Sequence, residues 1–260
     1  MPEAVIASTA RSPIGRAFKG SLKDIRPDDL TVQMVRAALD KVPALDAADI
    51  DDLVLGCGQP GGESGFNMGR IVAVLAGMDH VPGTTINRYC SSSLQSTRMA
   101  MHAMRAGEGD VFISAGVETV SRYTKGNADG LPDTKSPGFA EAETRTEKFA
   151  AGGQTWVDPR ENDDLPDAYI AMGQTAENVA QLKGVTRAEQ DELGVRSQNL
   201  AEKAIVNGGA IAVGHPFGMT GARITSTLIN SLGFHDKQFG LETMCVGGGQ
   251  GMAMILERLS

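Results

Sequence analysis

The chain has 260 residues, of which 41% are hydrophobic and 22% are charged, as in an ordinary globular protein. Its formal net charge of −8 argues against nucleic acid as a partner, because nucleic-acid-binding surfaces are basic. No apolar run approaches the ~20 residues that span a bilayer, and the N-terminus lacks the pattern of a secretion signal. We therefore expect a cytoplasmic protein that binds neither nucleic acid nor a membrane.

The first part of the chain, residues 1–120, alternates strand and helix patterns. Short apolar runs predict strands, and apolar residues at helical spacing predict helices between them. The predicted strands are 4–7, 53–56, 84–88 and 111–117, and the predicted helices are 29–41, 67–76 and 91–105. Such alternation is typical of an α/β fold with a mostly parallel sheet.

The second part, residues 121–205, begins with a change of composition. Residues 123–167 are rich in Gly, Pro and charged residues and show no sustained period, which favours a functional excursion over a plain loop. Helical periodicity returns at 168–182. Thr186 and Glu189 then form a capping-box pattern, which predicts the start of a helix that runs to about Ala204.

The third part, residues 206–260, starts with a Gly-rich loop. A helix is predicted at 222–231, and two strands are predicted around Cys245 and over 252–257. The chain is thus predicted to consist of three parts, 1–120, 121–205 and 206–260.

Three cysteines, Cys57, Cys90 and Cys245, stand far apart in the sequence. Their spacing matches neither a disulfide framework nor a zinc site. We expect reduced thiols and no bound metal.

Cys90 lies in NRYCSSSLQ, where a predicted strand meets a predicted helix. The positive end of a helix dipole and unpaired backbone N–H groups lower a thiol pKa there and favour the nucleophilic thiolate. The local sequence alone leaves two interpretations open, a nucleophile and a buried inert cysteine.

His215 lies in AVGHPFG, between Gly214 and Pro216, which fix the backbone around it. Taken alone, a histidine in such a place is more often a capping or core residue. Cys245 precedes a glycine run, which lets the backbone approach a ligand and direct N–H groups at an oxyanion. A dinucleotide-binding loop is disfavoured for this run, because no helix and no βαβ unit follow it.

Together, the segments NRYCSSSLQ, GGAIAVGHPFGMTGAR and CVGGGQG closely resemble the three signature regions of the thiolases (acetyl-CoA acyltransferases, or 3-ketoacyl-CoA thiolases). The resemblance implies an α/β fold of layered αβαβα type with mixed, mostly parallel sheets. Residues 1–120 would be the N-terminal half with the nucleophile. Residues 121–205 would be a loop domain that covers the CoA and acyl site, and 206–260 the remainder of an incomplete second half.

The resemblance also implies roles for five residues. Cys90 would be the nucleophile that carries the acyl group, and His215 the general base toward its thiol. Cys245 would exchange a proton with the α-carbon of acetyl-CoA. The amide of Gly247, with that of Cys90, would hold the acyl-enzyme oxygen, and Met172 would line the acyl end of the pocket.

Two positions depart from the wording that the resemblance leads us to expect. Ser93 stands where a small Gly is expected, which predicts a slightly narrower pocket. Ala171, just before Met172, stands where a His is frequent, which predicts a roomier or less polar pocket.

The implied reaction is the CoA-dependent thiolytic cleavage of 3-ketoacyl-CoA to acyl-CoA and acetyl-CoA, or the reverse Claisen condensation, in fatty acid or lipid metabolism. Acyl-CoA and coenzyme A would be substrates, without a further cofactor, and the protein would be a homodimer or homotetramer. The wording of the Cys90 segment favours the degradative type. A decarboxylating ketoacyl synthase shares the fold but pairs its Cys with two His, so the second thiol and its glycine run favour a thiolase.

The resemblance is interrupted at Ile205–Val206. Thiolases are longer by on the order of a hundred residues, enough for most of a domain, and an Asn-Glu-Ala-Phe motif whose Asn holds a catalytic water is absent from this sequence. Missing interior strands would leave the strands of the second half with few partners. Either the sequence omits a stretch of the molecule, or the deletion is real. A real deletion predicts an inactive acyl-CoA-binding or oligomer-forming remnant.

Overall fold

The computed structural model describes the chain except for residues 1–2, 126–128, 130, 153–154, 204–208 and 260. The chain divides into two compact units. Unit 1 comprises Met1–Asp129, Gly214–Met244 and Met252–Ser260, and unit 2 comprises Gly130–Val213 and Cys245–Gly251. The three-part division at 120 and 205 stays a prediction, and the interruption at Ile205–Val206 lies outside the described residues.

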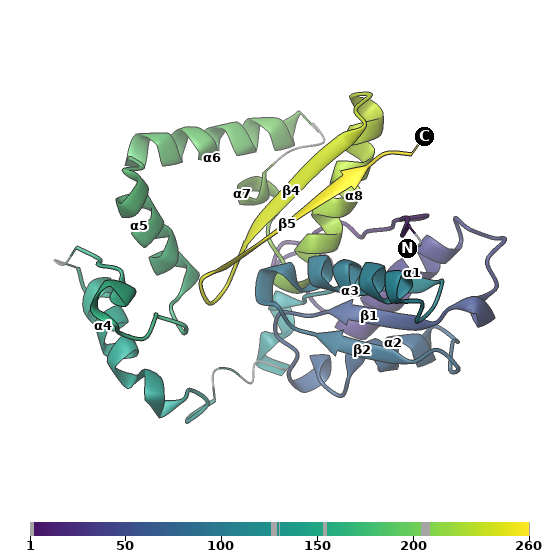
Figure 1. Cartoon of the computed structure of the whole chain (residues 1–260), viewed down its shortest axis with the longest axis horizontal. Coiled ribbons are helices and arrows are strands. Elements are labelled where there is room, and N and C mark those ends of the chain that lie inside the picture. Colours follow the sequence, from purple (N-terminus) through teal and green to yellow (C-terminus); the bar gives the residue numbers. More distant parts are fainter. Residues whose placement is uncertain (1–2, 126–128, 130, 153–154, 204–208, 260) are drawn as a thin grey trace. The chain divides into compact units, whose positions relative to one another are not determined.

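A parallel sheet forms the centre of unit 1 (Figure 1). Its strands, in spatial order, are β2 (Gly83–Ile86), β1 (Asp52–Gly56) and β3 (Phe112–Gly116). In the register of the sheet, Leu53 lies opposite Gly83 on one side and Ile113 on the other. These strands confirm the alternating α/β pattern that the sequence predicts.

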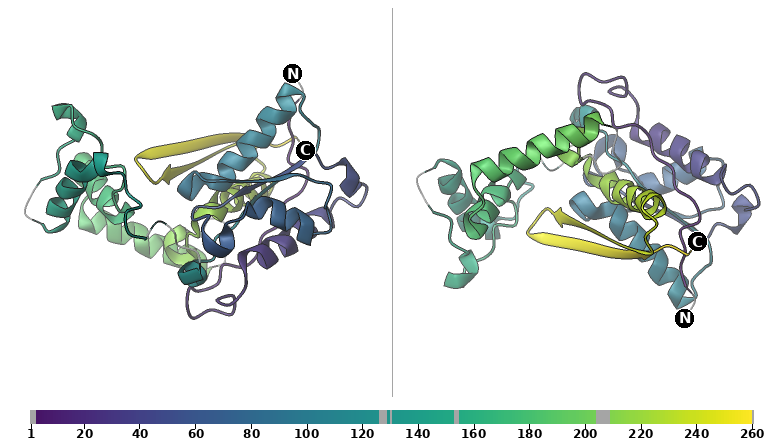
Figure 2. Two further views of the ribbon diagram at one scale, coloured as in Figure 1. Left: turned by 90° about the horizontal axis from the view of Figure 1, so that it is seen from below. Right: turned by 90° about the horizontal axis from the view of Figure 1, so that it is seen from above.

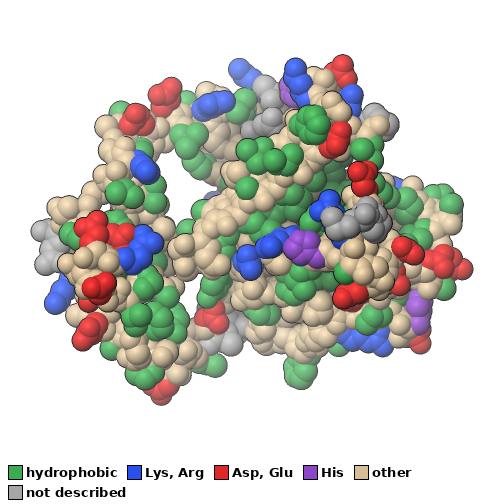
Figure 3. Space-filling view, in the orientation of Figure 1, with side chains coloured by type: hydrophobic (Ala, Val, Ile, Leu, Met, Phe, Trp, Pro, Cys, Tyr) green, Lys and Arg blue, Asp and Glu red, His purple; other side chains and the backbone are tan. Residues whose placement is uncertain are grey.

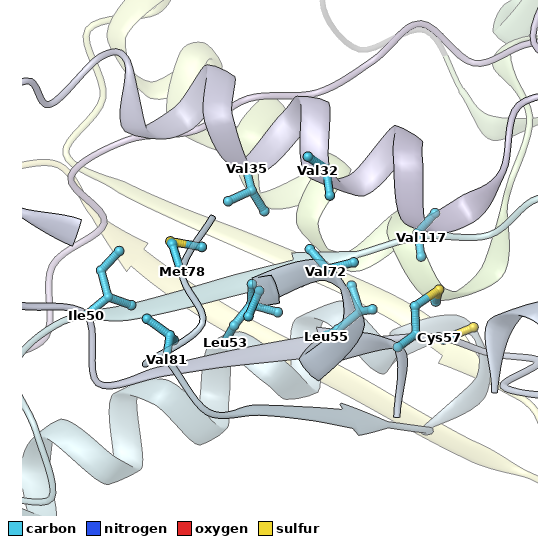
Figure 4. Close-up of a cluster of buried hydrophobic side chains, with 12 residues drawn as sticks. Val32, Val35, Ile50, Leu53, Leu55, Cys57, Val72, Met78, Val81 and Val117 are labelled. Carbon is cyan, nitrogen blue, oxygen red and sulfur yellow. The ribbon is translucent and has the colours of Figure 1, made fainter. Parts of the chain in front are cut away.

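Helices cover both faces of this sheet. Helices α1 (Pro27–Leu39) and α2 (Met68–Leu75) bury Val32, Val35 and Val72 against Leu53 and Leu55 of β1 (Figure 4). Helix α3 (Ser92–Ala106) lies on the opposite face, where a Cβ on Gly56 would meet its backbone at 2.4 Å. Because successive residues of a strand point to opposite faces, this apolar strand is buried on both sides, as is usual in parallel sheets.

The strand predicted at Ala4–Ala7 does not form. The segment pairs with none of the described strands, and Val5 and Ile6 are 56% and 41% exposed. An apolar run becomes a strand only where a neighbour supplies the hydrogen-bond ladder. The local sequence carries no information about that neighbour.

Helix α8 (Thr220–Phe234) packs against α3 and forms a second helical layer with it. It also contacts β3, and it approaches β4 (Phe239–Val246), where a Cβ on Gly240 would lie 2.6 Å from the Leu228 side chain. Strand β5 (Gln250–Glu257) completes a two-stranded sheet with β4, and Figure 2 shows this hairpin beside α8. Unit 1 thus stacks helices, sheet, helices and hairpin in four layers.

The outer face of the hairpin is apolar and exposed. Phe239, Leu241 and Ile255 are 61%, 62% and 71% exposed, and hydrophobic side chains are visible over the hairpin in Figure 3. Among the described strands, β4 and β5 pair only with each other. This agrees with the expectation that the second-half strands have few partners.

Unit 2 is built mainly from helices. They are α4 (Ala140–Ala150), α5 (Met172–Lys183), α6 (Arg187–Glu202) and the short α7 (Ala210–Val213). The predicted capping box is confirmed: Thr186 accepts from the amide of Glu189, whose side chain accepts from the amide of Thr186. Across the described ranges of the chain, no helix combines the length and apolar character that crossing a membrane requires.

Candidate active site

Cys90 lies where the chain turns from β2 into α3, as the sequence predicts. A short 3-10 helix, Tyr89–Ser91, precedes α3. Tyr89 has φ of 43°, in the left-handed region that non-glycine residues rarely adopt, and its amide donates to Asn87 Oδ1 at 2.7 Å. Backbone strain of this kind gathers at functional sites, and here it immediately precedes the predicted nucleophile.

Cys90 is 4% exposed and lies next to the first turn of α3. A helix N-terminus carries partial positive charge and N–H groups that its own turns do not use. Such a position stabilises a thiolate relative to a thiol. The local geometry therefore suits a cysteine nucleophile.

Cys57 differs from Cys90 in its surroundings. It is fully buried at the end of β1, and burial, aided by the neighbouring Glu118 carboxylate, raises the pKa of its thiol to about 12. Cys57 therefore stays protonated and unreactive at neutral pH. In the part of the chain that the structure describes, no cluster of His, Cys, Asp and Glu could hold a metal ion.

His215 is held by a short hydrogen-bond chain. Its Nδ1 lies 2.7 Å from Thr220 Oγ1, and the Thr220 hydroxyl donates to the carbonyl of Pro216 at 2.8 Å. The single hydroxyl proton is thereby used, so Nδ1 carries the ring proton and donates to Thr220. This tautomer leaves Nε2 as the proton acceptor.

The environment of His215 keeps its ring neutral. Burial, with a smaller contribution from the positive charge of Arg223, lowers the pKa of His215 below its ordinary value of 6.5. A neutral imidazole at pH 7 can accept a proton from a thiol. Both the tautomer and the charge state therefore suit a general base.

The segments that carry Cys90 and His215 pack together within unit 1. The 3-10 helix of Cys90 lies against a second 3-10 helix, Phe217–Met219, two residues after His215. The amide of Ala222 in α8 donates to Ser93 Oγ at 2.8 Å. A Cβ on Gly221 would lie 2.2 Å from the amide nitrogen of Leu94, so only glycine allows this close approach of α8 to α3.

Cys245, Gly247 and Met172 belong to unit 2. Cys245 is exposed on β4, and the turn after it places Gly248 and Gly249 at φ of 76° and 73°, a conformation that favours glycine. Gly247 accepts from the side chain of Gln250 at 3.1 Å. Met172 is the first residue of α5 and is 36% exposed. The roles assigned to these three residues stay predictions.

Sequence reasoning missed two polar residues of the Cys90–His215 region, Thr220 and Glu118, and it missed the hydrogen bond of a third, Ser93. Thr220 fixes the tautomer of His215, Ser93 accepts from α8, and Glu118 is a buried carboxyl at the end of β3. The sequence held a signal for Glu118 alone: it is a charged residue directly after an apolar strand, at the edge where α/β folds place ligands. The predicted narrowing of the pocket by Ser93 stays a prediction.

The fold and the three segments agree with a comparison against family models. The model described as Thiolase, N-terminal domain, matches residues 4–212, and the model described as Thiolase, C-terminal domain, matches residues 176–258. The first of these covers well over half of the chain. The chain therefore belongs to the thiolase family, as the sequence motifs predict.

Curated relatives agree with this assignment. A 3-ketoacyl-CoA thiolase of Bacillus subtilis (strain 168) is 39% identical over 209 residues, which cover 80% of this chain and 47% of the relative. The 3-oxoadipyl-CoA/3-oxo-5,6-dehydrosuberyl-CoA thiolase of Escherichia coli (strain K12) is 38% identical over 210 residues, 80% of this chain and 50% of the relative. The chain thus spans about half the length of the curated relatives it matches.

A third relative bears on the interruption of the family pattern. A 3-ketoacyl-CoA thiolase of Serratia proteamaculans (strain 568) is 25% identical over 388 aligned residues, which cover all of both chains. These 388 positions exceed the 260 residues of this chain by 128. At least 128 aligned positions of this relative therefore have no counterpart here, which agrees with an interrupted match.

Proposed function

We propose that the protein is a thiolase that cleaves 3-ketoacyl-CoA with coenzyme A, or runs the reverse condensation, through an acyl thioester on Cys90. The observation that carries the proposal is the packing of the Cys90 helix start against the segment after a neutral His215 whose Nε2 is free to accept a proton. Family membership and the names of the relatives support the choice of substrate class.

In the proposed cleavage, His215 Nε2 takes the proton of the Cys90 thiol, and the thiolate attacks the 3-keto carbon. The bond between C2 and C3 breaks, and the acetyl-CoA enolate takes a proton at C2 from the Cys245 thiol. The incoming coenzyme A gives its thiol proton to the Cys245 thiolate, and its sulfur takes the acyl group from Cys90. The released Cys90 thiolate regains its proton from His215. Backbone N–H groups of Cys90 and Gly247 would stabilise the oxyanion. Coenzyme A is a substrate here, and we propose no further cofactor.

A second candidate is a non-catalytic acyl-CoA-binding or oligomer-forming remnant. The specific observation in its favour is the absence of at least 128 positions of a full-length relative, together with the absent Asn-Glu-Ala-Phe motif. Losing one oxyanion donor costs roughly 10²–10³ in rate. A remnant would bind acyl-CoA or associate with itself but would not turn it over.

Product formation from acetoacetyl-CoA and coenzyme A separates the two candidates. A thiolase gives two acetyl-CoA per acetoacetyl-CoA, and Cys90→Ala abolishes the reaction while folding is retained. A remnant binds acetoacetyl-CoA in calorimetry without releasing acetyl-CoA. Undiminished turnover by Cys90→Ala would refute the thiolase mechanism. Light scattering of the same sample tests the proposed homodimer or homotetramer, and fractionation of the source cells tests the proposed cytoplasmic location.

A further inference from the structure

Glu118 is a buried carboxyl that the proposed reaction does not use. It follows Val117, whose amide extends the β1–β3 ladder by donating to the carbonyl of Gly56 at 3.0 Å. The Glu118 residue is 8% exposed. Val117 and Cys57 lie together at this end of the sheet (Figure 4). A charged side chain in such a place is costly unless it is fully hydrogen-bonded.

The Glu118 carboxylate accepts three backbone hydrogen bonds. Its Oε2 accepts from the amides of Gly58 and Gly218, both at 2.8 Å. Its Oε1 accepts from the amide of Gln59 at 3.2 Å. Gly58 and Gln59 follow β1, whereas Gly218 lies 100 residues further along the chain than Glu118. The Glu118 side chain thus hydrogen-bonds to two segments that are far apart in the sequence.

Two glycines allow this arrangement. A Cβ on Gly58 would lie 2.9 Å from Glu118 Oε2 and 2.9 Å from Phe217 Cβ. A Cβ on Gly218 would lie 2.7 Å from the Cα of Cys57. Any larger residue at either position would separate the strand end from the loop, so the backbone is shaped for both amides to reach one carboxylate oxygen.

The two segments that hydrogen-bond to Glu118 belong to the candidate active site. Gly218 lies three residues after His215, in the 3-10 helix that packs on the one containing Cys90. A Cβ on Gly58 would also lie 3.4 Å from the carbonyl of Tyr89, the residue before Cys90. The Glu118 carboxylate is therefore bonded to the His215 loop from a position beside the Cys90 segment.

Burial and hydrogen bonding act in opposite directions on the protonation of Glu118. Burial raises the pKa of Glu118, and the three N–H donors oppose that rise. The neighbouring titratable groups are the Cys57 thiol and the Tyr123 hydroxyl, whose pKa values are both raised by burial and by this carboxylate. A protonated Glu118 would lose acceptor capacity that the three amides require.

We propose that Glu118 is a positioning residue that holds the His215 loop at the distance from Cys90 that proton transfer requires. The proposal rests on the proposed function, since it gives His215 the part of base toward Cys90. A shift of about 1 Å in such an arrangement slows chemistry by as much as about a hundredfold. Loss of the Glu118 hydrogen bonds is therefore expected to lower the reactivity of Cys90, although both reacting groups, Cys90 and His215, are still present.

Asp51 supplies a matched control at the opposite end of the same strands. Its carboxylate accepts from the amides of Asp110 and Val111 at 2.7 and 2.9 Å, just before β3 begins. It therefore ties β1 to β3, as Glu118 does, but at the end of the sheet remote from Cys90 and His215. Asp51→Ala removes backbone hydrogen bonds of the same kind without touching the site.

The experiment measures the rate at which iodoacetamide alkylates Cys90 in the whole chain between pH 6 and 9, by peptide mass spectrometry. This readout requires no CoA chemistry. Glu118→Ala is expected to slow alkylation at pH 7 about tenfold and to move the profile to higher pH, as His215→Ala does. The double variant is expected to be no slower than His215→Ala. Glu118→Gln keeps a carbonyl acceptor for two amides and is expected to stay close to the wild-type profile.

Asp51→Ala is expected to lower the melting temperature and leave the alkylation profile unchanged. If Glu118→Ala does not fold, Glu118→Asp, which is one methylene too short to reach both segments, is expected to show the same loss. A wild-type profile for Glu118→Ala or for His215→Ala, or effects that multiply in the double variant, would overturn the proposal. Failure of the wild-type protein to form an acyl enzyme would instead count against the proposed function. The alkylation rates would still test the role of Glu118, because they require no CoA chemistry.

Discussion

Glu242 provides a quantitative test of the packing between α8 and β4. The residue is 6% exposed, and burial raises the pKa of its carboxyl from 4.5 to about 7. The Thr225 hydroxyl lies within hydrogen-bond distance of both Gly221 O and Glu242 Oε1, at 2.8 and 2.7 Å. One hydroxyl proton serves only one of these acceptors. A protonated Glu242 resolves the conflict by donating to Thr225.

The sign of the pH dependence follows from the raised pKa. Glu242 binds its proton more tightly in the folded protein than in the unfolded chain. Protonated Glu242 therefore contributes its full stability to the fold below pH 4.5, and this contribution is lost as the pH rises through about 7. By linkage, ionised Glu242 destabilises the fold by about 3 kcal/mol at pH 8 and by about 1 kcal/mol at pH 5. Glu242→Gln mimics the protonated form and does not titrate.

Urea unfolding of the wild-type and variant proteins at pH 5 and pH 8, followed by circular dichroism, measures this difference. Glu242→Gln is expected to exceed the wild-type free energy of unfolding by about 3 kcal/mol at pH 8 and by about 1 kcal/mol at pH 5. Glu192→Gln, at an exposed position of α6, is the control and is expected to leave the free energy of unfolding close to that of wild type. Equal differences at the two pH values, or a less stable Glu242→Gln at pH 8, would refute the reasoning.

Three further predictions concern the contacts around α8. Thr220→Val removes the acceptor that fixes the His215 tautomer, so the rate of Cys90 acylation in a quenched-flow assay is expected to fall about tenfold. Thr220→Ser retains the hydroxyl and is expected to keep the wild-type rate. Ser93→Ala leaves the partly buried amide of Ala222 in the first turn of α8 without its partner and is expected to cost about 1–3 kcal/mol in urea unfolding. An unchanged urea midpoint would contradict this hydrogen bond. Gly221→Ala forces a Cβ to 2.2 Å from the Leu94 backbone and is expected to cost about 1–3 kcal/mol, whereas Gly233→Ala in the same helix meets nothing within 4 Å and should melt no lower than wild type.

Local features of the fold could be predicted from the sequence. The strand-to-helix junction at Cys90 follows from an apolar β-branched run that meets a helical pattern, and the capping box at Thr186 follows from two residues three apart. Both depend on interactions within a few residues of each other. The strand predicted at Ala4–Ala7 was wrong, because its formation depends on a partner strand that local sequence does not specify.

The remote contacts of the site could not be predicted. The bond between Glu118 and the Gly218 amide joins residues 100 positions apart, and the bond between Ser93 and the Ala222 amide joins residues 129 apart. Sequence reasoning assigned Ser93 to pocket width, whereas the structure shows its hydroxyl bonded to the start of α8. Such contacts follow from the packing of layers, which periodicity and motif spacing do not encode.

Trapping the acyl enzyme is the most direct test of the central claim, that Cys90 is the nucleophile of a thiolase. The whole chain is mixed with acetoacetyl-CoA without free coenzyme A and is then quenched in acid and digested. The masses of its peptides are measured by mass spectrometry. The account predicts an acetyl group on Cys90, its absence in Cys90→Ala, and its slower appearance in His215→Ala. An unmodified Cys90, or an acetyl group carried by another residue at the same rate in Cys90→Ala, would contradict it.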